Sequence, residues 1–219
     1  MSHNEIRLRF PYLQNSANSI YFDNAATTHK PDSVIRSGID FYSSYNSNIH
    51  RSVHNLSATA TDQYERVRKK IKKFICAEKS EEIIFTSGAT ESINLVAQSY
   101  VKNILSAGDV IFVSPIEHHS NIVPWQVIAK ETGALLKYLP INNDLEIDFK
   151  KLGALFDSRV KFIASHHVSN VTGLVQNVKA LVREAKKFNI PVLIDGAQAV
   201  AHIPVNVAEM GCDFYCFSG

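Results

Sequence analysis

Short apolar runs alternate with amphipathic stretches along most of this 219-residue chain. Between the runs, apolar residues recur at helical spacing in stretches that begin near Ala60, Ile93 and Leu181, and Pro124 suits the first turn of a fourth helix. Strands that alternate with helices are typical of βαβ units. The sequence therefore predicts an α/β fold with a mainly parallel, mixed sheet and helices on both faces. The predicted strands span residues 82–86, 110–114, 135–139, 160–165, 192–195 and 213–217.

Composition limits the classes of protein that this chain can represent. A hydrophobic content of 45% is enough for one large domain or for part of a larger one. The net charge of +2 gives no reason to expect nucleic acid or a membrane surface as a partner. No apolar run approaches the length of a transmembrane helix, and the polar N-terminus lacks the apolar core of a signal peptide.

Cysteine usage and the start of the alternation give two further expectations. Three scattered cysteines, an odd and low number, fit free thiols in a reducing cytosol, so we expect a cytoplasmic protein. Residues 1–30 precede the regular alternation and are predicted to form an N-terminal arm and entry segment. Residues 31–219 are predicted to form the large domain.

Polar residues follow the predicted strands where each strand ends. The run 191–194 stops at Asp195, which taken alone fits a turn cap as well as a ligand-binding group. The other strand ends lead to Ala89 and Thr90, to His118, to Asn170 and to Ser218. Because the carboxyl ends of parallel strands meet at one edge of a sheet, we expect these side chains to converge there.

The converging groups suit a flat, phosphorylated and cationic heterocycle. A helix that starts after Gly88 offers free backbone N–H groups, and Thr90 adds a hydroxyl, which together suit a phosphate. An aromatic ring would stack on His118, and Asp195 would pair with a protonated ring nitrogen. These are the needs of pyridoxal 5′-phosphate, so the sequence predicts a site for this cofactor.

A metal site is the competing interpretation, because histidines occur in the doublets 118–119 and 166–167 and at the i, i+4 spacing of His50 and His54. Neighbouring residues on a strand point to opposite faces, so a doublet is a poor chelating pair. The helical motif of metallohydrolases does not occur in the sequence. No metal ligands are therefore assigned, and a dinucleotide site is disfavoured because the G-x-G-x-x-G fingerprint does not occur either.

Seven segments in order through nearly the whole chain carry a resemblance to a known family. They are YFDNAATT (21–28), NIHRSVH (48–54), TSGATESINLV (86–96), EHHSNIVPW (117–125), HVSNVTG (167–173), VLIDGAQA (192–199) and CDFYCFSG (212–219). With them the chain resembles a cysteine desulfurase of the class V aminotransferases, which are fold type I enzymes dependent on pyridoxal phosphate. The EHHSNIVPW segment is similar to the sulfur-mobilisation (SUF) subgroup, close to selenocysteine lyases.

The resemblance implies a role for each matching residue. It implies an aspartate aminotransferase-like large domain in which phosphate is held by Ala89, Thr90 and Ser218. His118 would stack on the ring and help to move protons, and His50 would line the substrate pocket near the boundary of a homodimer. The remaining implied contacts are Asn170 and Gln198 at the phenolic oxygen of the ring and Asp195 at its nitrogen.

The activity that the resemblance implies is the removal of sulfur from L-cysteine. The products would be L-alanine and an enzyme-bound persulfide, whose sulfur passes to an acceptor protein for iron–sulfur cluster assembly. A selenocysteine lyase that acts on L-selenocysteine, or another class V enzyme, is the enzymatic alternative.

The sequence departs from the family pattern at its end. The Schiff-base lysine of the family follows Ser-Gly-His, whereas the residues given end at Ser218 and Gly219. We therefore expect an N-terminal half, truncated before this lysine and without the smaller C-terminal domain and the sulfur-accepting cysteine. None of the cysteines at 76, 212 and 216 matches that acceptor. By itself the 219-residue chain is expected to be inactive, and a non-catalytic truncated remnant is the second alternative.

Overall fold

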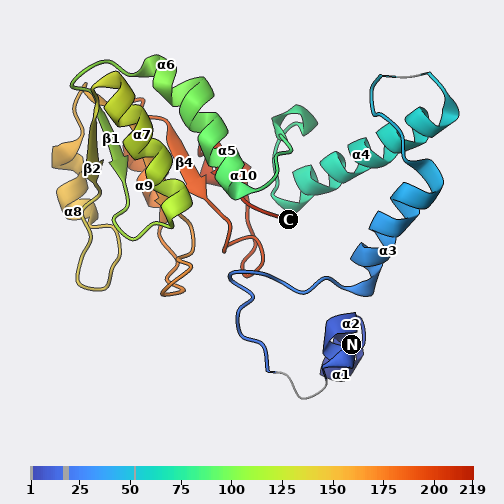
Figure 1. Ribbon diagram of the computed structural model, residues 1–219. Coiled ribbons are helices and arrows are strands. Elements are labelled where there is room, and N and C mark those ends of the chain that lie inside the picture. The colour runs from blue at the N-terminus through green and yellow to red at the C-terminus, as the bar shows by residue number, and fades with distance from the viewer. Residues whose placement is uncertain (1, 17–19, 52) are drawn as a thin grey trace. The chain divides into compact units, whose positions relative to one another are not determined.

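A parallel β-sheet forms the core of residues 71–219 in the computed structural model, which describes residues 2–16, 20–51 and 53–219 (Figure 1). Its order is β2-β1-β3-β4-β5, and all neighbouring strands in this sheet run parallel. The strands are β1 (Val110–Val113), β2 (Leu135–Tyr138), β3 (Val160–His166), β4 (Val192–Asp195) and β5 (Phe214–Cys216). The predicted α/β fold with a mainly parallel sheet is confirmed, and five of the six predicted strands are present.

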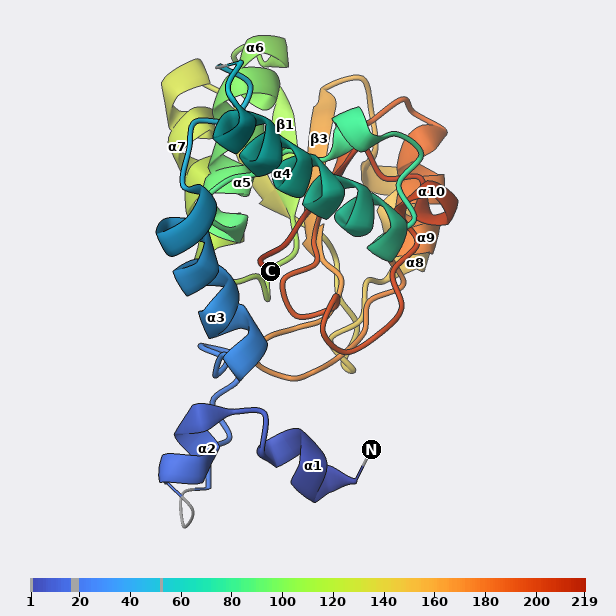
Figure 2. The same ribbon diagram turned by 90° about the vertical axis from the view of Figure 1, so that its right-hand side faces the viewer.

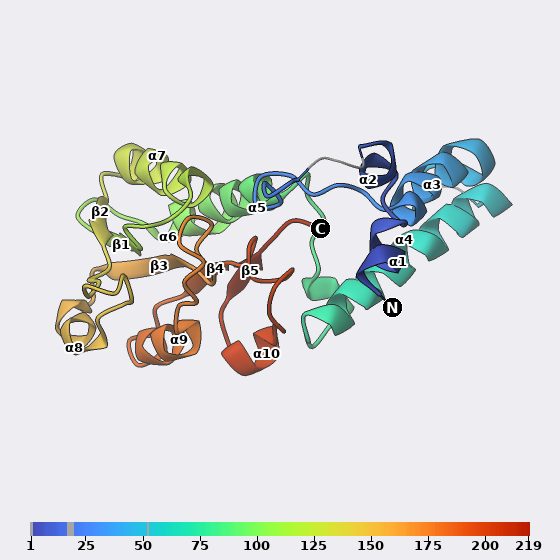
Figure 3. The same ribbon diagram turned by 90° about the horizontal axis from the view of Figure 1, so that it is seen from below.

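Helices cover both faces of the sheet, because the strands are apolar on both sides. On one face lie α5 (Ala89–Val96), the π-helical turn η3 (Ala97–Val101), α6 (Lys102–Ile104) and α7 (Val123–Thr132). On the other lie α8 (Phe149–Leu152), α9 (Val178–Lys186) and α10 (Val207–Met210). The two layers are separated by the sheet in Figures 2 and 3. Trp125 and Phe162 fill the core on the α5–α7 face, and Leu181 and Ile194 fill the core on the α9 face.

The predicted helices are present at the expected places. The stretch from Ala60 lies in α4 (Asn55–Phe74), the stretch from Ile93 lies in α5 and η3, and the stretch from Leu181 lies in α9. Pro124 occupies the first turn of α7, where its missing N–H would have no helical partner in any case.

The prediction of a strand at 82–86 was wrong. The 3-10 helix η2 (Ser80–Glu82) occupies its beginning, and residues 83–86 have no strand partner among the described residues. Ile84 is 65% exposed. The segment is apolar enough for a strand, but a strand also requires a neighbour at ladder distance. A cavity, described below, lies between residues 83–86 and the end of β5.

Contacts divide the chain into two units, one that ends at Lys70 and one that begins at Ile71. The first contains α1 (His3–Arg7), α2 (Pro11–Asn15), α3 (Asp32–Asp40), the π-helix η1 (Phe41–Tyr45) and most of α4. The predicted division at residue 30 stays a prediction. Residues 1 and 17–19 of the predicted arm, and residue 52 of the NIHRSVH segment, lie outside the described residues.

Candidate cofactor-binding site

Asp195 is the last residue of β4 and lies at the carboxyl edge of the sheet. It is 6% exposed, and its Oδ1 accepts a hydrogen bond from the backbone N–H of Ala197 at 2.9 Å. Burial raises the pKa of this carboxyl group, the Ala197 N–H lowers it, Glu117 raises it, and His118 and His166 lower it. A buried carboxylate of this kind is favoured as an anion when a cation lies against it.

The start of α5 meets the end of β5 at the same edge. Ala89, the first residue of α5, donates its backbone N–H to Ser218 Oγ at 3.0 Å, across 129 positions of sequence. The preceding Gly88 has φ 156° and ψ 177°, a conformation that is open almost only to glycine. The N–H groups of a first helical turn have no partner within the helix and form its positive end. This end of α5 suits an anion such as phosphate.

The other predicted ring-binding residues lie in loops that follow strands. His118 is exposed, and its Nδ1 lies 2.8 Å from Ser120 Oγ and accepts the Ser120 N–H at 3.2 Å. Asn170 is exposed in the turn after β3, and Gln198 is half-buried in the turn after β4. All of these loops leave the carboxyl ends of the strands, as the parallel arrangement requires.

Comparison with known families identifies the group of proteins to which this architecture belongs. The family described as "Aminotransferase class-V" matches residues 20–219. The chain belongs to the class-V aminotransferase family.

Relatives of this class-V chain are named as cysteine desulfurases. A "Probable cysteine desulfurase" of Halalkalibacterium halodurans is 47% identical over 222 residues, which cover 100% of this chain and 55% of the relative. A cysteine desulfurase of Yersinia pestis is 45% identical over 98% of this chain and 53% of its own length. The apo structure of a cysteine desulfurase from Thermococcus onnurineus NA1 has a TM-score of 0.90 and 37% identity, with 100% of this chain and 53% of that chain covered. The class-V chain therefore spans about half the length of the proteins that it matches.

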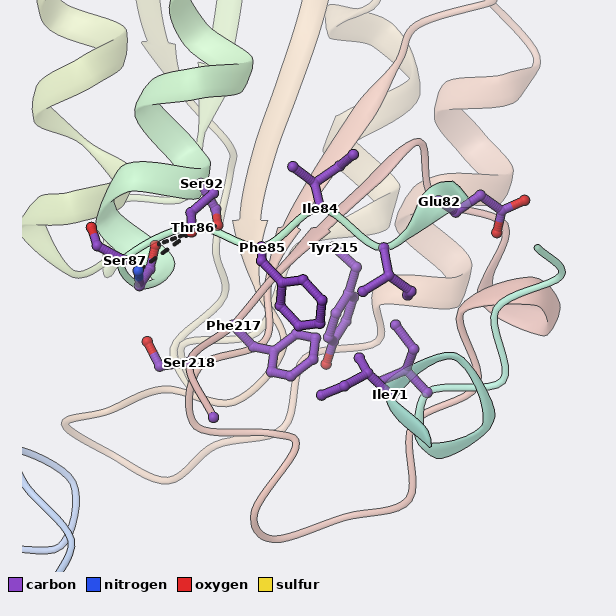
Figure 4. Close-up of a pocket in the computed structure, with 14 residues that line it drawn as sticks. Ile71, Glu82, Ile84, Phe85, Thr86, Ser87, Ser92, Tyr215, Phe217 and Ser218 are labelled. Atoms are coloured by element: carbon purple, nitrogen blue, oxygen red, sulfur yellow. Dashed lines mark hydrogen bonds between the residues drawn. The ribbon is translucent and has the colours of Figure 1, made fainter. Parts of the chain in front are cut away.

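A cavity of about 370 Å³ lies beside the start of α5 in the class-V chain (Figure 4). One end is polar, with Thr86, Ser87, Ser92 and Ser218, and the other end is mostly apolar but includes Glu82. The apolar end is lined by Ile71, Ile75, Ile83, Phe85 and Phe217. The cavity reaches Gly88 and Ser218 beside the start of α5, but Asp195, His118, Asn170 and Gln198 do not line it.

His50 belongs to the unit that ends at Lys70, and the structure describes it with neighbours from α4. Its backbone N–H donates to Thr61 Oγ1 at 3.1 Å, and its Nε2 lies 3.3 Å from Glu65 Oε1. Its φ of 58° is in the left-handed region, which is uncommon for a residue other than glycine. The predicted role of His50 in the substrate pocket stays a prediction.

Glu117 and His166 were not assigned to the site from the sequence. Glu117 Oε1 accepts the backbone N–H of His166 at 2.6 Å and lies 2.5 Å from His166 Nδ1. The two residues are 49 positions apart, so no local spacing could indicate their contact. The one available signal was an acidic residue next to the His118–His119 doublet at a strand end.

Tyr215 on β5 was also missed. A Cβ atom added to Gly196 would lie 2.2 Å from carbon atoms of the Tyr215 ring, so the ring occupies the space that this glycine leaves open. The Tyr215 hydroxyl lies 3.0 Å from His167 Nδ1. Gly196 therefore has a packing role in the structure.

Three further properties of the described residues concern thiol reactivity, metal binding and membrane insertion. Burial raises the pKa of the thiols of Cys212 and Cys216 to about 12, so both stay protonated near neutral pH and are poor nucleophiles. Among the described residues, no three His, Cys, Asp or Glu side chains gather as a metal site would require. In the described part of the chain, no helix combines the length and the hydrophobicity needed to cross a membrane.

Proposed function

We propose that this class-V chain forms the cofactor-binding part of a cysteine desulfurase that depends on pyridoxal 5′-phosphate. The observation that carries the proposal is the buried carboxylate of Asp195 at the same sheet edge as the start of α5. The 45–47% identity to relatives named as cysteine desulfurases supports it.

The residues at this edge fit the cofactor. The N–H groups of Ala89 and Thr90, with the Ser218 hydroxyl, would hold its phosphate at the positive end of α5. His118 would stack on the ring, and Asn170 and Gln198 would bind the ring oxygen. When bound, pyridoxal phosphate supplies an electron sink for the carbanion that forms on the amino acid.

Asp195 has the most specific task in this site. Without a cation beside it, burial disfavours its charged form. A protonated pyridine nitrogen would supply that cation, and Asp195 would in turn hold the proton on the nitrogen. The carboxylate would thereby preserve the positive charge on which the electron sink depends.

The activity of the whole protein follows from the same proposal. It would release sulfur from L-cysteine, with L-alanine as the other product, and would carry the sulfur as a persulfide to an acceptor protein of iron–sulfur cluster assembly. Because desolvation raises the pKa of the Cys212 and Cys216 thiols, neither suits the persulfide. L-Selenocysteine is the alternative substrate. We further propose a cytoplasmic homodimer with His50 in its substrate pocket, and an arm over 1–30 before a large domain over 31–219.

The test is cofactor binding and turnover in the full-length protein, with Asp195→Asn as the variant. We expect the variant to bind pyridoxal phosphate at least about 30-fold more weakly, because truncation of one partner of a buried, hydrogen-bonded charge pair costs about 2–5 kcal/mol. Release of alanine from L-cysteine, and of sulfide after an added thiol reductant cleaves the persulfide, would be measured alongside, and L-selenocysteine would be compared.

Asp213→Asn is the matched control. Asp213 precedes β5 at the opposite end of the sheet, where its Oδ2 accepts the Val192 N–H at 2.8 Å. It should leave cofactor affinity unchanged. Unaltered affinity in Asp195→Asn, or no sulfur release from L-cysteine by protein that has bound the cofactor, would contradict the proposal.

A further inference from the structure

A chain of buried polar side chains crosses the space between α7 and the end of β3. Trp125 Nε1 donates to Asn121 Oδ1 at 2.9 Å, and Asn121 Nδ2 donates to Glu117 Oε2 at 2.7 Å. The other oxygen of Glu117 accepts the backbone N–H of His166 and contacts His166 Nδ1. The Glu117 side chain is 0% exposed and that of His166 is 5% exposed. Polar groups are costly to bury, so a network of this kind requires a reason.

The directions of the hydrogen bonds define the roles of the groups. Among the described residues, the Glu117 oxygens contact N–H groups and a ring nitrogen that can carry hydrogen. Glu117 therefore acts as an acceptor on both oxygens, which suits a carboxylate anion. His166 Nδ1 then carries hydrogen toward Glu117. His166 Nε2 is buried and has no hydrogen-bond partner among the described residues.

The pair lies beside Asp195. His166 and Asp195 are register partners on the adjacent strands β3 and β4. Phe162 and Ala164 alternate with their neighbours on β3 and belong to the core on the Trp125 face, so His166 points to this face as well. The N–H of His167 also donates to the carbonyl oxygen of Asp195 at 2.8 Å. The network thus joins the loop that carries His118 to the strand end next to Asp195.

We propose that Glu117 and His166 are positioning residues of the ring site, whose buried pair fixes the His118 loop against the end of β3 and balances the charge next to Asp195. This inference rests on the function proposed above. Glu117 alone would place an anion beside Asp195, and His166 supplies the compensating partner. The pair therefore fixes the His118 loop to β3 without disfavouring the charged form of Asp195, which the protonated ring nitrogen requires.

The electrostatic surroundings of Asp195 support this division of roles. Among the charged groups around it, Glu117 raises its pKa, whereas His166 and His118 lower it. From β5, Tyr215 and Cys216 also interact with Asp195, and burial raises the pKa of both, so they stay neutral near pH 7.

The test compares two substitutions that remove opposite halves of the pair. The probe is pyridoxal 5′-phosphate, and its binding to the full-length protein is measured by equilibrium dialysis from neutral to acid pH. His166→Gln leaves Glu117 uncompensated, so the pH at which binding fails should move upward, with about three- to tenfold weaker binding at the acid end. Glu117→Gln removes the anion, so its acid limit should stay at or below that of the unaltered protein. The double variant should return close to the unaltered profile.

A merely structural pair would give a different pattern, with weaker binding in both single variants and the acid limit displaced in the same direction. That result, or an unaltered acid limit in His166→Gln, would overturn the inference. His119→Gln is the matched control, because His119 is exposed on the same loop and should leave the profile unchanged. Inorganic phosphate is the second probe, and its affinity should not respond to His166→Gln because Asp195 does not contact it.

Failure of the proposed function has its own signature. If the unaltered protein binds no pyridoxal phosphate at any pH, the proposed function and this inference are both overturned. If it binds the cofactor but the single variants do not separate, the inference alone is overturned. Comparison of His166→Gln with the double variant still decides the question if Glu117→Gln alone fails to fold.

Discussion

His166 and His167 are neighbours in sequence, but they lie in different chemical environments on opposite faces of the sheet. His166 points to the α5–α7 face and contacts the buried carboxylate of Glu117. His167 is 8% exposed, contacts the Tyr215 hydroxyl and lines a cavity with Val178 of α9 and Met210 of α10. Burial lowers the pKa of His167, with a smaller contribution from His166, so this ring is favoured as neutral. The alternation of a strand therefore separates a histidine that contacts a buried carboxylate from one that is packed against a tyrosine.

The two faces differ in the free-energy cost of burying their polar groups. On the His166 face, ionisable groups are buried together, and each depends on the others for compensation. On the His167 face, the strands are held together by a neutral hydrogen bond to the Tyr215 hydroxyl and by the packing of the Tyr215 ring against Gly196. Substitutions on the His166 face should therefore change stability through the loss of a charge partner. Substitutions on the His167 face should change stability through the fit of the side chains.

The largest effect is expected from Glu117→Ala. This change removes the acceptor of Asn121 Nδ2, of the His166 N–H and of the His166 ring, all of which stay buried. Loss of one partner of a buried pair costs about 3–5 kcal/mol, and we expect the free energy of unfolding to fall by this amount. Urea unfolding can be followed by the fluorescence of Trp125, which is the single tryptophan of the sequence given and belongs to the same network.

Glu184→Ala is the control for that experiment. Glu184 Oε2 contacts Lys187 Nζ at 2.6 Å, where the lysine is well exposed, and its loss should cost less than about 1 kcal/mol. If both substitutions cost the same, burial does not distinguish the two pairs and the comparison between the faces fails.

Gly196→Ala tests the opposite face and should have the next largest effect. The new methyl group would lie 2.2 Å from the Tyr215 ring, so the ring must move away and weaken its contact with His167. Overpacking of this kind costs about 1–3 kcal/mol, measurable by urea unfolding. Gly153→Ala is the matched control, because nothing lies within 4 Å of its added Cβ and its φ is −61°. Equal stability of the two variants would show that Gly196 is not needed for packing.

Asp195→Asn should stabilise the protein without cofactor. The pKa of Asp195 is raised in the folded state, so the folded state binds its proton more tightly than the unfolded state does. Above the folded pKa, folding therefore carries a cost that asparagine avoids, and we expect a gain of about 0.5–2 kcal/mol at neutral pH. The gain should shrink as the pH falls through the folded pKa toward the unfolded value. A loss of stability at neutral pH would show that Asp195 is already compensated by its protein neighbours.

The sequence predicted the architecture well because its signal is local. Apolar runs and helical spacing identified five strands and the helices from Ala60, Ile93 and Leu181, and the parallel order placed Asp195 at an edge with the start of α5. The segment 82–86 failed because strand formation depends on a neighbour, which apolar character alone does not supply.

The site was predictable only in part for a related reason. The sequence alone predicts a place at a strand or helix end for Asp195, Ala89 and Ser218. The Glu117–His166 contact joins residues far apart in sequence, and the Tyr215 ring against Gly196 depends on the packing of two strands. Such contacts follow from tertiary structure, and the histidine doublet at 166–167 was rejected as a chelating pair without any indication of what each ring contacts.

The smallest effect is expected for the pH dependence of stability that His167 contributes. Its pKa is lowered in the folded state, so the unfolded state binds the proton more readily. The contribution is complete above the unfolded value of about 6.5 and is lost as the pH falls below it toward the folded pKa. His167→Gln should therefore reduce the fall in unfolding free energy below about pH 6.5, by less than about 1 kcal/mol. His202→Gln, at an exposed histidine, should leave the slope unchanged. Asp195 contributes a pH dependence of the opposite sign, so the His167 variant is best measured in an Asp195→Asn background. An unaltered slope there would show that burial on the α9 face does not disfavour the charged imidazole of His167.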